Sequence, residues 1–242
     1  MLHSVISEHI AKVRLQVEQA CYKVGRNPAE VKILAVSKTQ QADAVAAAAK
    51  TGQQAFGENY LQEALEKQSV LQAEHPKLEW HFIGPVQSNK TRDIAEHFAW
   101  VHTLDREKIA RRLAEQRPED LPPLQVLIQV NVSGEASKSG VAPEQVIALA
   151  DTVRQLPRLQ LRGLMCIPEA TEQVAQQQAA FCQLRSLLEQ LQSHFAKTGE
   201  SDALLDTLSM GMSGDLDAAI AEGSTLVRIG TAIFGARAAK IS

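Results

Sequence analysis

An alternation of short apolar segments with longer helix-forming ones runs through the sequence from residue 31 onward. The short segments are rich in aliphatic and β-branched residues, which indicates buried strands. The longer segments have helix-forming composition, as in the alanine-rich residues 42–50, which Gly52 terminates. The eight candidate strands are residues 31–36, 54–57, 79–83, 100–103, 124–132, 159–167, 206–209 and 225–229. The candidate helices between them are residues 42–50, 59–73, 89–97, 105–116, 142–156, 171–197 and 216–222.

Eight strand-helix units in 242 residues match the α/β class and, within it, a (β/α)8 barrel of the TIM type. A doubly wound open sheet uses the same alternation and is the competing arrangement. We predict the barrel, because closure accommodates eight units in one domain better. Residues 2–24 carry a further apolar face and predict an extra N-terminal helix that covers one end or side of the core. We expect residues 1–242 to form a single domain.

The charge distribution argues against several classes of partner. The chain has 25 basic and 28 acidic residues, mixed along its length without long runs of one sign. This pattern is not that of a protein that binds nucleic acid or an anionic membrane surface. Charged residues interrupt the first segment, where a signal peptide needs an apolar core, so we expect a cytoplasmic protein. The three cysteines indicate neither a disulfide framework nor a zinc site of the CxxC type.

Lys38 lies just beyond the first predicted strand, in Ser37-Lys38-Thr39. In a barrel the carboxyl ends of all strands meet at one mouth, which is where active sites are found. An ammonium group there is unusual if packing is the only requirement. The competing interpretation is that the strand ends at Val36 and that Lys38 is a solvated loop charge.

Two segments near the end of the chain have the composition of phosphate-binding turns. Residues 209–215, SMGMSGD, combine glycines, hydroxyls and a following helix, and residues 228–231, RIGT, follow the eighth strand. The alternative is an ordinary capped turn in which Ser213 is the N-cap and Asp215 serves the helix dipole. In a closed barrel the eighth strand pairs with the first, so one ligand could contact Lys38 and both turns. A phosphorylated aldehyde such as pyridoxal 5'-phosphate (PLP) has the required chemistry, since an amine forms a Schiff base with its carbonyl.

Seven motifs carry a resemblance to a known family: AVSKT, FGENY, WHFIGPVQSNK, SGEASKSG, RGLMCIP, SMGMSGDLDAAI and VRIGTAIFGAR. In this order, from about Val31 to Arg237, they resemble the pyridoxal-phosphate homeostasis protein family, single-domain relatives of the alanine racemase barrel. The resemblance implies a (β/α)8 barrel that carries PLP as a covalent aldimine on Lys38. It also implies that Arg228 faces the pyridine nitrogen and that Asn59 and Met165 line the ring. The residues that it assigns to the phosphate are Ser209, Gly211, Met212, Ser213, Gly230 and Thr231.

The sequence departs from the family pattern beside Lys38. Gln40 and Gln41 occupy positions where a basic residue and a proline would be expected. This puts an accessory charge next to Lys38 in question, but not the aldimine itself. Lys138, in SGEASKSG, could reach the mouth as a second amine, although a solvated loop lysine is the default interpretation. Glu58 could orient Lys38 or another group at the mouth.

The leading functional hypothesis is a PLP-binding protein of vitamin B6 homeostasis that holds or carries the cofactor without catalysis. Racemases of this class need a second base, a tyrosine from an additional domain of a partner subunit. This chain ends at Ser242 and has only Tyr22 and Tyr60, of which Tyr60 could face the mouth. The alternative is a weak PLP-dependent racemase that uses Lys38 alone. We expect a monomer whose partners are PLP and, transiently, PLP-dependent apoenzymes.

A metal-dependent barrel hydrolase is a third hypothesis, based on His81 and His102, which fall on or near predicted strands. Neither an HxH pair nor a carboxylate partner accompanies them in the sequence. A core or supporting role for these two histidines is therefore the preferred interpretation, and we predict no metal site.

Overall fold

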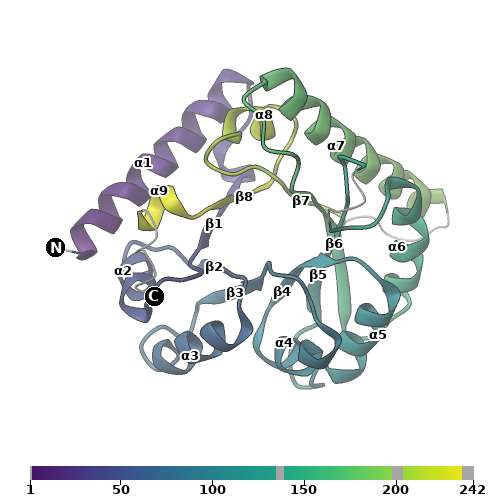
Figure 1. Cartoon of the computed structure of the whole chain (residues 1–242), viewed down its shortest axis with the longest axis horizontal. Helices are drawn as coiled ribbons and strands as arrows, with labels where there is room; N and C mark the ends of the chain where they lie inside the picture. The colour runs from purple at the N-terminus through teal and green to yellow at the C-terminus, as the bar shows by residue number, and fades with distance from the viewer. Residues whose placement is uncertain (1, 135–138, 198–203, 236–242) are drawn as a thin grey trace.

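The computed structural model, which describes residues 2–134, 139–197 and 204–235, is a closed barrel of parallel strands in sequential order, from β1 to β8 and back to β1 (Figure 1). The predicted (β/α)8 barrel is thus confirmed and the open sheet is excluded. The strands are β1 (Lys32–Val36), β2 (Ala55–Glu58), β3 (Glu79–Phe82), β4 (Trp100–Leu104), β5 (Leu124–Gln129), β6 (Leu159–Met165), β7 (Thr207–Ser209) and β8 (Leu226–Ile229).

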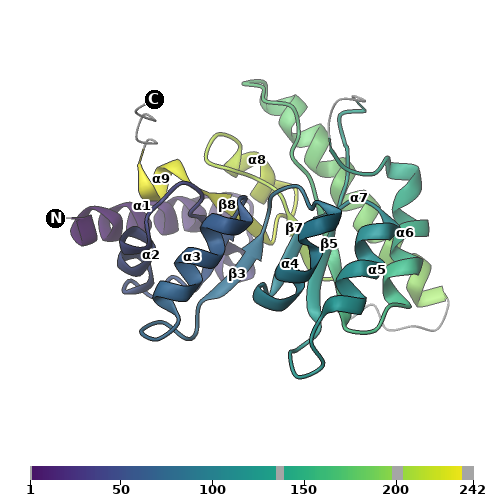
Figure 2. The ribbon, with the colours of Figure 1, turned by 60° about the horizontal axis from the view of Figure 1, so that its bottom comes forward.

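Helices surround the barrel as an outer layer (Figures 1 and 2). They are α1 (Leu2–Lys23), α2 (Ala42–Ala49), α3 (Leu61–Leu71), α4 (Thr91–His97), α5 (Glu107–Gln116), α6 (Val146–Arg154), α7 (Val174–Lys197), α8 (Leu216–Ala221) and α9 (Thr231–Phe234). Short 3-10 turns precede β1, α4 and α6, at Pro28–Glu30, Ser88–Lys90 and Pro143–Gln145. Within the described residues, none of these helices combines the length and apolar character that crossing a membrane requires.

The predicted N-terminal helix covers the side of the barrel where it closes. Helix α1 packs against α2, α8 and α9, outside the seam between β8 and β1 (Figure 1). Its buried face includes Ile6, Ile10, Val13 and Val17, spaced as the apolar pattern predicted. Because α9 after β8 is only 4 residues long, α1 supplies the apolar cover that a full eighth helix would give.

The end of β5 and the start of α7 differ from the sequence prediction for local reasons. Strand β5 ends at Gln129 rather than at Val132, because Val130 makes only an isolated bridge to Val141 and the chain then turns. Helix α7 begins at Val174 rather than at Thr171, whose hydroxyl accepts a hydrogen bond from the backbone N–H of Gln173 at 3.1 Å. This bond competes with a helical start at Thr171.

The inside of the barrel differs in composition from the layer outside it. Between strands and helices the core is apolar and continuous, whereas Trp100, Leu127 and Met165 form a small separate cluster. Several fully or nearly buried polar side chains also come from strands or their carboxyl ends: Glu58, His81, His102, Ser209 and Arg228. Buried polar groups need partners, so these residues direct attention to the site above them.

Candidate functional site

Barrel closure brings together two segments that are far apart in the sequence, the one that follows β1 and the one that follows β8. Strand β1 pairs with β8 so that Leu34 lies opposite Arg228 and Ala35 opposite Ile229. The two chain segments that follow, at Lys38 and Gly230, therefore leave the barrel side by side. A Cβ added to Gly230 would lie 3.4 Å from the Val36 carbonyl oxygen, which shows how closely the segments approach. The predicted adjacency of the Lys38 segment and the 228–231 segment is confirmed.

Lys38 occupies the tip of a tight turn. The Gln40 N–H donates to the Ser37 carbonyl at 3.0 Å, which closes a four-residue turn with Lys38 and Thr39 at its centre. Thr39 has a φ of 65°, in the left-handed region that β-branched residues rarely adopt. The conformation holds Lys38, half-buried, at the carboxyl end of β1.

A buried ion cluster holds this turn from below. The Lys67 ammonium donates to the Ser37 carbonyl at 2.7 Å, to Glu58 Oε1 at 2.7 Å and to Glu63 Oε1 at 2.6 Å. The Ser37 hydroxyl donates to Glu58 Oε1 at 2.6 Å, and Glu63 Oε1 accepts the Thr39 N–H at 2.5 Å. The residues on both sides of Lys38 are thus fixed by one cluster.

The electrostatics of the cluster depend on Lys67. Its side chain is 4% exposed and that of Glu58 is fully buried. Burial raises the pKa of Glu58, while the adjacent Lys67 ammonium and the Ser37 hydroxyl act in the opposite direction. One cation thus compensates two carboxylates in a region of low dielectric constant. The sequence left the role of Glu58 open, and its observed partners are Ser37 and Lys67.

The predicted phosphate turn is compact and closed by its own aspartate. Asp215 Oδ1 accepts the Met212 N–H at 2.6 Å, and Asp215 is the residue that precedes α8. The alternative in which Ser213 is the N-cap is therefore wrong. Gly211 has a φ of 96°, and a Cβ there would lie 2.5 Å from Ala219 Cβ. Ser213 and Gly214 are exposed at the tip of the turn.

Arg228 connects the carboxyl ends of three strands. Its Nη1 donates to the Ser209 carbonyl at 2.7 Å and to Ser209 Oγ at 2.9 Å, and its Nη2 donates to the Cys166 carbonyl at 2.9 Å. The side chain is buried, which lowers the pKa of the guanidinium without removing its charge. Within the described part of the chain, Nε and one N–H of Nη2 have no hydrogen-bond partner.

The remaining predicted site residues differ in their burial and in their position relative to the mouth of the barrel. Asn59 directly follows β2, and its Oδ1 is buried without a hydrogen-bond partner among the described residues. Gly230 and the exposed Thr231 begin α9. Met165 is fully buried against Trp100 and Leu127. Its contact with a ring therefore stays a prediction.

Ser209 has partners other than the expected phosphate. Its hydroxyl is fully buried between Arg228 and His102, whose Nδ1 lies 3.0 Å from Oγ. A direct phosphate contact from Ser209 stays a prediction, and these contacts point instead to support of Arg228. Lys138 lies outside the described residues.

Two histidines that the sequence left without partners form a chain inside the barrel. His81 Nδ1 lies 2.9 Å from His102 Nε2, and His81 Nε2 lies 2.8 Å from Glu79 Oε1. The expectation that no carboxylate accompanies His81 is wrong. The signal was present, because residues two apart on a strand share a face. Among residues 2–134, 139–197 and 204–235, no group of histidine, cysteine and acidic side chains could hold a metal ion.

Cys166 lies beside this site but is not a reactive thiol. Burial raises its pKa to about 12, so the thiolate is not populated near neutral pH. Its backbone carbonyl, not its sulfur, contacts Arg228. Cys166 is therefore a small buried residue of the core.

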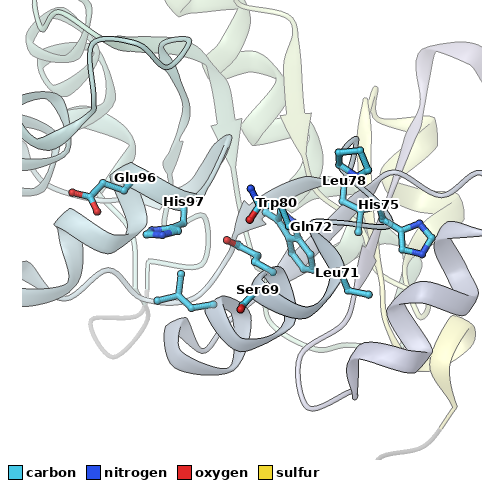
Figure 3. A pocket seen from close by; sticks show the side chains of 11 residues that line it. Ser69, Leu71, Gln72, His75, Leu78, Trp80, Glu96 and His97 are labelled. Carbon is cyan, nitrogen blue, oxygen red and sulfur yellow. The ribbon is translucent and has the colours of Figure 1, made fainter.

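A separate hollow opens on the outside of the barrel, between α3 and α4 (Figure 3). Gln72, His75 and Trp80 are among its lining residues, together with Glu96 and His97 at the end of α4. These residues come from the carboxyl ends of the helices and the amino end of β3, whereas Lys38 lies at the opposite end of the strands. The hollow is therefore not part of the candidate site.

Comparison with known proteins gives consistent matches over nearly the whole chain. Residues 13–238 match the family described as alanine racemase, N-terminal domain. The pyridoxal phosphate homeostasis protein of Pseudomonas aeruginosa is 62% identical over 234 residues, which cover 97% of this chain and 96% of the relative. The protein of the same name from Escherichia coli strain K12 is 50% identical over 233 residues, or 96% of this chain and 97% of that one.

Solved structures agree with these matches. PipY of Synechococcus elongatus with PLP bound has a TM-score of 0.81 and 37% identity, over 95% of this chain and 100% of that chain. An alanine racemase from Corynebacterium glutamicum has a TM-score of 0.70 at 16% identity and covers 99% of this chain and 64% of its own. At that identity the likeness shows a shared fold.

Proposed function

Since the chain belongs to the pyridoxal phosphate homeostasis protein family, we propose that it binds PLP at the carboxyl end of the barrel and holds it covalently on Lys38. The observation that supports this most is the juxtaposition of Lys38 with the 228–231 segment through the β1–β8 pairing. The Lys38 amine would form a C=N bond with the aldehyde carbon, with loss of one water molecule. PLP is a reactive aldehyde, so a reversible lysine site suits storage of the cofactor.

The residues present fit the chemical groups of PLP. For the phosphate, exposed hydroxyls are available at Ser213 and Thr231, beside the backbone of Gly230 and of the Gly211–Ser213 turn. For the ring, the unsatisfied Asn59 Oδ1 and the unpartnered N–H groups of Arg228 are available. An orphaned buried polar atom commonly marks the place of an absent partner.

Arg228 has a specific chemical consequence at the pyridine nitrogen. A guanidinium is always a donor and stays charged, so it favours the unprotonated ring nitrogen. An unprotonated ring is a weaker electron sink than a protonated one, which disfavours carbanion chemistry. Racemases of this barrel class work with such an arginine, so the weaker electron sink favours a holding role and is also compatible with catalysis.

We accordingly propose a cytoplasmic, non-catalytic holder of PLP that contributes to homeostasis and passes the cofactor to apoenzymes. We also propose that the chain binds PLP as a monomer. The alternative, a weak racemase, predicts exchange of the α-proton of amino acids. Incubation of the loaded protein with a panel of amino acids in D2O, followed by mass spectrometry, separates the two. Exchange at ordinary enzymatic rates would refute the holding role.

Borohydride reduction followed by peptide mapping tests the covalent site. The wild-type protein and the Lys32→Ala variant should both carry the pyridoxyl group on Lys38 and show a long-wavelength absorption band. Lys32 is a matched control, because it lies at the opposite end of the same strand. Lys38→Ala should lose both signals. A surviving band, or a pyridoxyl group on another residue, would contradict the assignment.

A further inference from the structure

One continuous line of hydrogen bonds crosses the inside of the barrel. It begins at Glu79, the first residue of β3, and passes through His81 and His102 to Ser209, the last residue of β7. Ser209 Oγ then contacts Arg228 Nη1 at 2.9 Å. All links are between 2.8 and 3.0 Å long. The line joins the amino end of the barrel to the arginine at its mouth.

The Glu79 end determines the direction of this line. A carboxylate can only accept, so His81 must donate its Nε2–H to Glu79. The other nitrogen of a neutral His81 then accepts, and His102 must donate its Nε2–H to it. His102 Nδ1 in turn accepts, and the Ser209 hydroxyl must donate its proton to it.

Both histidine rings are neutral in this arrangement. Burial lowers the pKa of His81 and lowers that of His102 well below the ordinary value. The hydrogen bond from His81 lowers the pKa of Glu79, in agreement with an ionised carboxylate as the terminal acceptor. Two charged rings 2.9 Å apart would also repel each other strongly.

The contacts of Arg228 require the same direction of hydrogen-bond donation, independently of the argument from Glu79. A guanidinium has no acceptor, so Ser209 Oγ must accept from Nη1 with a lone pair. The single hydroxyl proton of Ser209 is then available for His102 Nδ1. If the line ran in the opposite direction, Ser209 would receive two donors and its own proton would have no acceptor among its observed partners.

We infer that Glu79, His81, His102 and Ser209 form a one-way hydrogen-bonded chain that positions Arg228, with both histidines held as Nε2–H tautomers. Because these bonds all point in one direction, they polarise one another. Through them the negative charge of the Glu79 carboxylate helps to compensate the positive charge of the buried Arg228 guanidinium. Ser209 becomes an obligate acceptor for Arg228. The guanidinium is thereby fixed with its unpartnered N–H groups available to the ring nitrogen of PLP. This last step rests on the proposed function.

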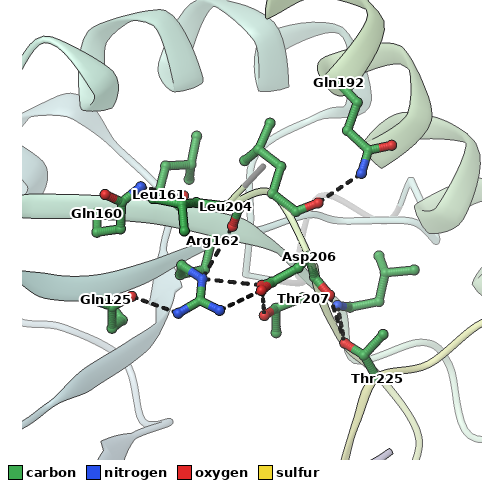
Figure 4. Close-up of polar contacts among 11 residues, drawn as sticks. Gln125, Gln160, Leu161, Arg162, Gln192, Leu204, Asp206, Thr207 and Thr225 are labelled. Atoms are coloured by element: carbon green, nitrogen blue, oxygen red, sulfur yellow. Dashed lines mark hydrogen bonds and ion pairs between the residues drawn. The ribbon is translucent and has the colours of Figure 1, made fainter. Parts of the chain in front are cut away.

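Trp100 and Arg162 hold the His81 ring in the required orientation. The ring stacks on Trp100, with centroids 5.2 Å apart and an interplanar angle of 4°. Arg162 lies over the Trp100 ring, with its guanidinium carbon 5.0 Å from the centroid. Arg162 is itself bound to Gln125 and Asp206, as Figure 4 shows. The stack fixes the plane of the His81 ring, and within that plane Nδ1 faces His102 and Nε2 faces Glu79.

The tautomers can be read directly from the protein without cofactor. In a long-range 1H–15N correlation spectrum of histidine-labelled protein at pH 7.5, His81 and His102 should both show the neutral Nε2–H pattern. A Nδ1–H tautomer, or an imidazolium, at either position would overturn the chain. Because no PLP is present, this result is independent of the proposed function.

Variants at each end test the connection to Arg228. Ser209→Ala removes the donor to His102 Nδ1, so the 15N shift of that nitrogen should move, while His81 keeps its tautomer through Glu79. Glu79→Leu should release the His81 tautomer and Glu79→Gln, which keeps an acceptor, should restore it. Thr207→Val is the matched control, since Thr207 is a buried polar residue of the same strand as Ser209 but is outside the chain. It should leave both rings unchanged.

Titration with PLP completes the test. Ser209→Ala should weaken PLP binding by about threefold to tenfold, as expected for one lost hydrogen bond of this kind, and should shift the absorption band. Thr207→Val should bind as the wild type does. Equal binding by Ser209→Ala and the wild type would refute the positioning role even if the tautomers are as inferred. Absence of PLP binding by the wild type would instead refute the proposed function, leaving the tautomer result as the test of the chain.

Discussion

The Lys67 ammonium lies 2.7 Å from the Ser37 carbonyl oxygen, one residue before Lys38. The two residues are 30 positions apart in sequence, on α3 and at the end of β1. Lys67 reaches the turn from a helix that packs outside the barrel, so a charge-assisted hydrogen bond couples the outer layer to the candidate site. This contact explains why a lysine is buried on a helix that is otherwise amphipathic.

Substitution of Lys67 by methionine should therefore destabilise the protein strongly. Methionine keeps much of the side-chain length but leaves Glu58 buried without a cation. Removal of one partner from a buried ion pair costs about 3–5 kcal/mol of unfolding free energy. The measurement is urea unfolding of the protein without PLP. The double variant Lys67→Met, Glu58→Gln should recover part of the loss, because the fully buried Glu58 charge is then absent and only the half-buried Glu63 lacks its cation.

Lys23 provides the matched control for this prediction. Its ion pair with Asp217 is just as short, at 2.6 Å, but both side chains are more than half exposed. Lys23→Met should change the free energy of unfolding by less than about 1 kcal/mol. Equal losses for the Lys23 and Lys67 variants would show that burial does not determine the contribution of the pair.

Much of this organisation could be predicted from the sequence, for identifiable reasons. The barrel was predicted from the alternation of strands with helices and from the number of strands, because strands and helices have different patterns of apolar residues. The position of Lys38 relative to the 228–231 segment followed from closure alone. These predictions depend on local patterns and on one topological rule, which the sequence expresses directly.

The supporting contacts could not be predicted in the same way. Lys67 has a carboxylate four residues before it, at Glu63, but this spacing is typical of exposed helix pairs. Only the packing of α3 against the strand ends decides that the pair is buried. The link from His102 to Ser209 joins residues 107 positions apart, and no local pattern reports such a contact. The sequence therefore predicts reactive groups better than it predicts the groups that hold them.

Thr39→Gly should stabilise the protein slightly. The left-handed φ of 65° costs a β-branched residue roughly 1–2 kcal/mol, and glycine adopts it without strain. The more flexible unfolded chain offsets part of this gain, so a net increase of up to about 1 kcal/mol is expected. Gln40→Gly, at the next position of the same turn, should instead lower stability, because Gln40 is not among the residues with positive φ. Urea unfolding of both variants checks the difference in sign.

Stability should fall as the pH falls from 7.5 to 5.5, because His81 and His102 stay neutral when folded. Their pKa values are lowered in the folded state, so the unfolded chain binds more protons below about pH 6.5. The stabilisation is complete above that pH and is lost as the pH decreases. Each histidine contributes at most about 1.4 kcal/mol over this interval, the limit for a ring that stays neutral throughout it. Denaturant unfolding at several pH values measures the sum.

Two carboxyl groups have the opposite effect on stability over part of the same pH range. Burial raises the pKa values of Glu58 and Asp215, so their protonation favours the folded state as the pH decreases. The pH series is therefore repeated in the Glu58→Gln, Asp215→Asn variant, which isolates the histidines. A flat stability profile in that variant would mean that His81 and His102 become protonated without unfolding.

Gly211→Ala should impair both stability and PLP binding, whereas Gly214→Ala should affect neither substantially. Gly211 combines a φ of 96° with a Cβ position 2.5 Å from Ala219 Cβ. Both the added Cβ and Ala219 Cβ are attached directly to backbone, so the turn or α8 must move. Gly214, three residues further along the same turn, has nothing within 4 Å of its added Cβ. The strain at Gly211 should cost about 1–3 kcal/mol of unfolding free energy. Displacement of the turn should weaken PLP binding, measured by absorption titration, and equal affinities for the two variants would show that the turn does not hold the phosphate.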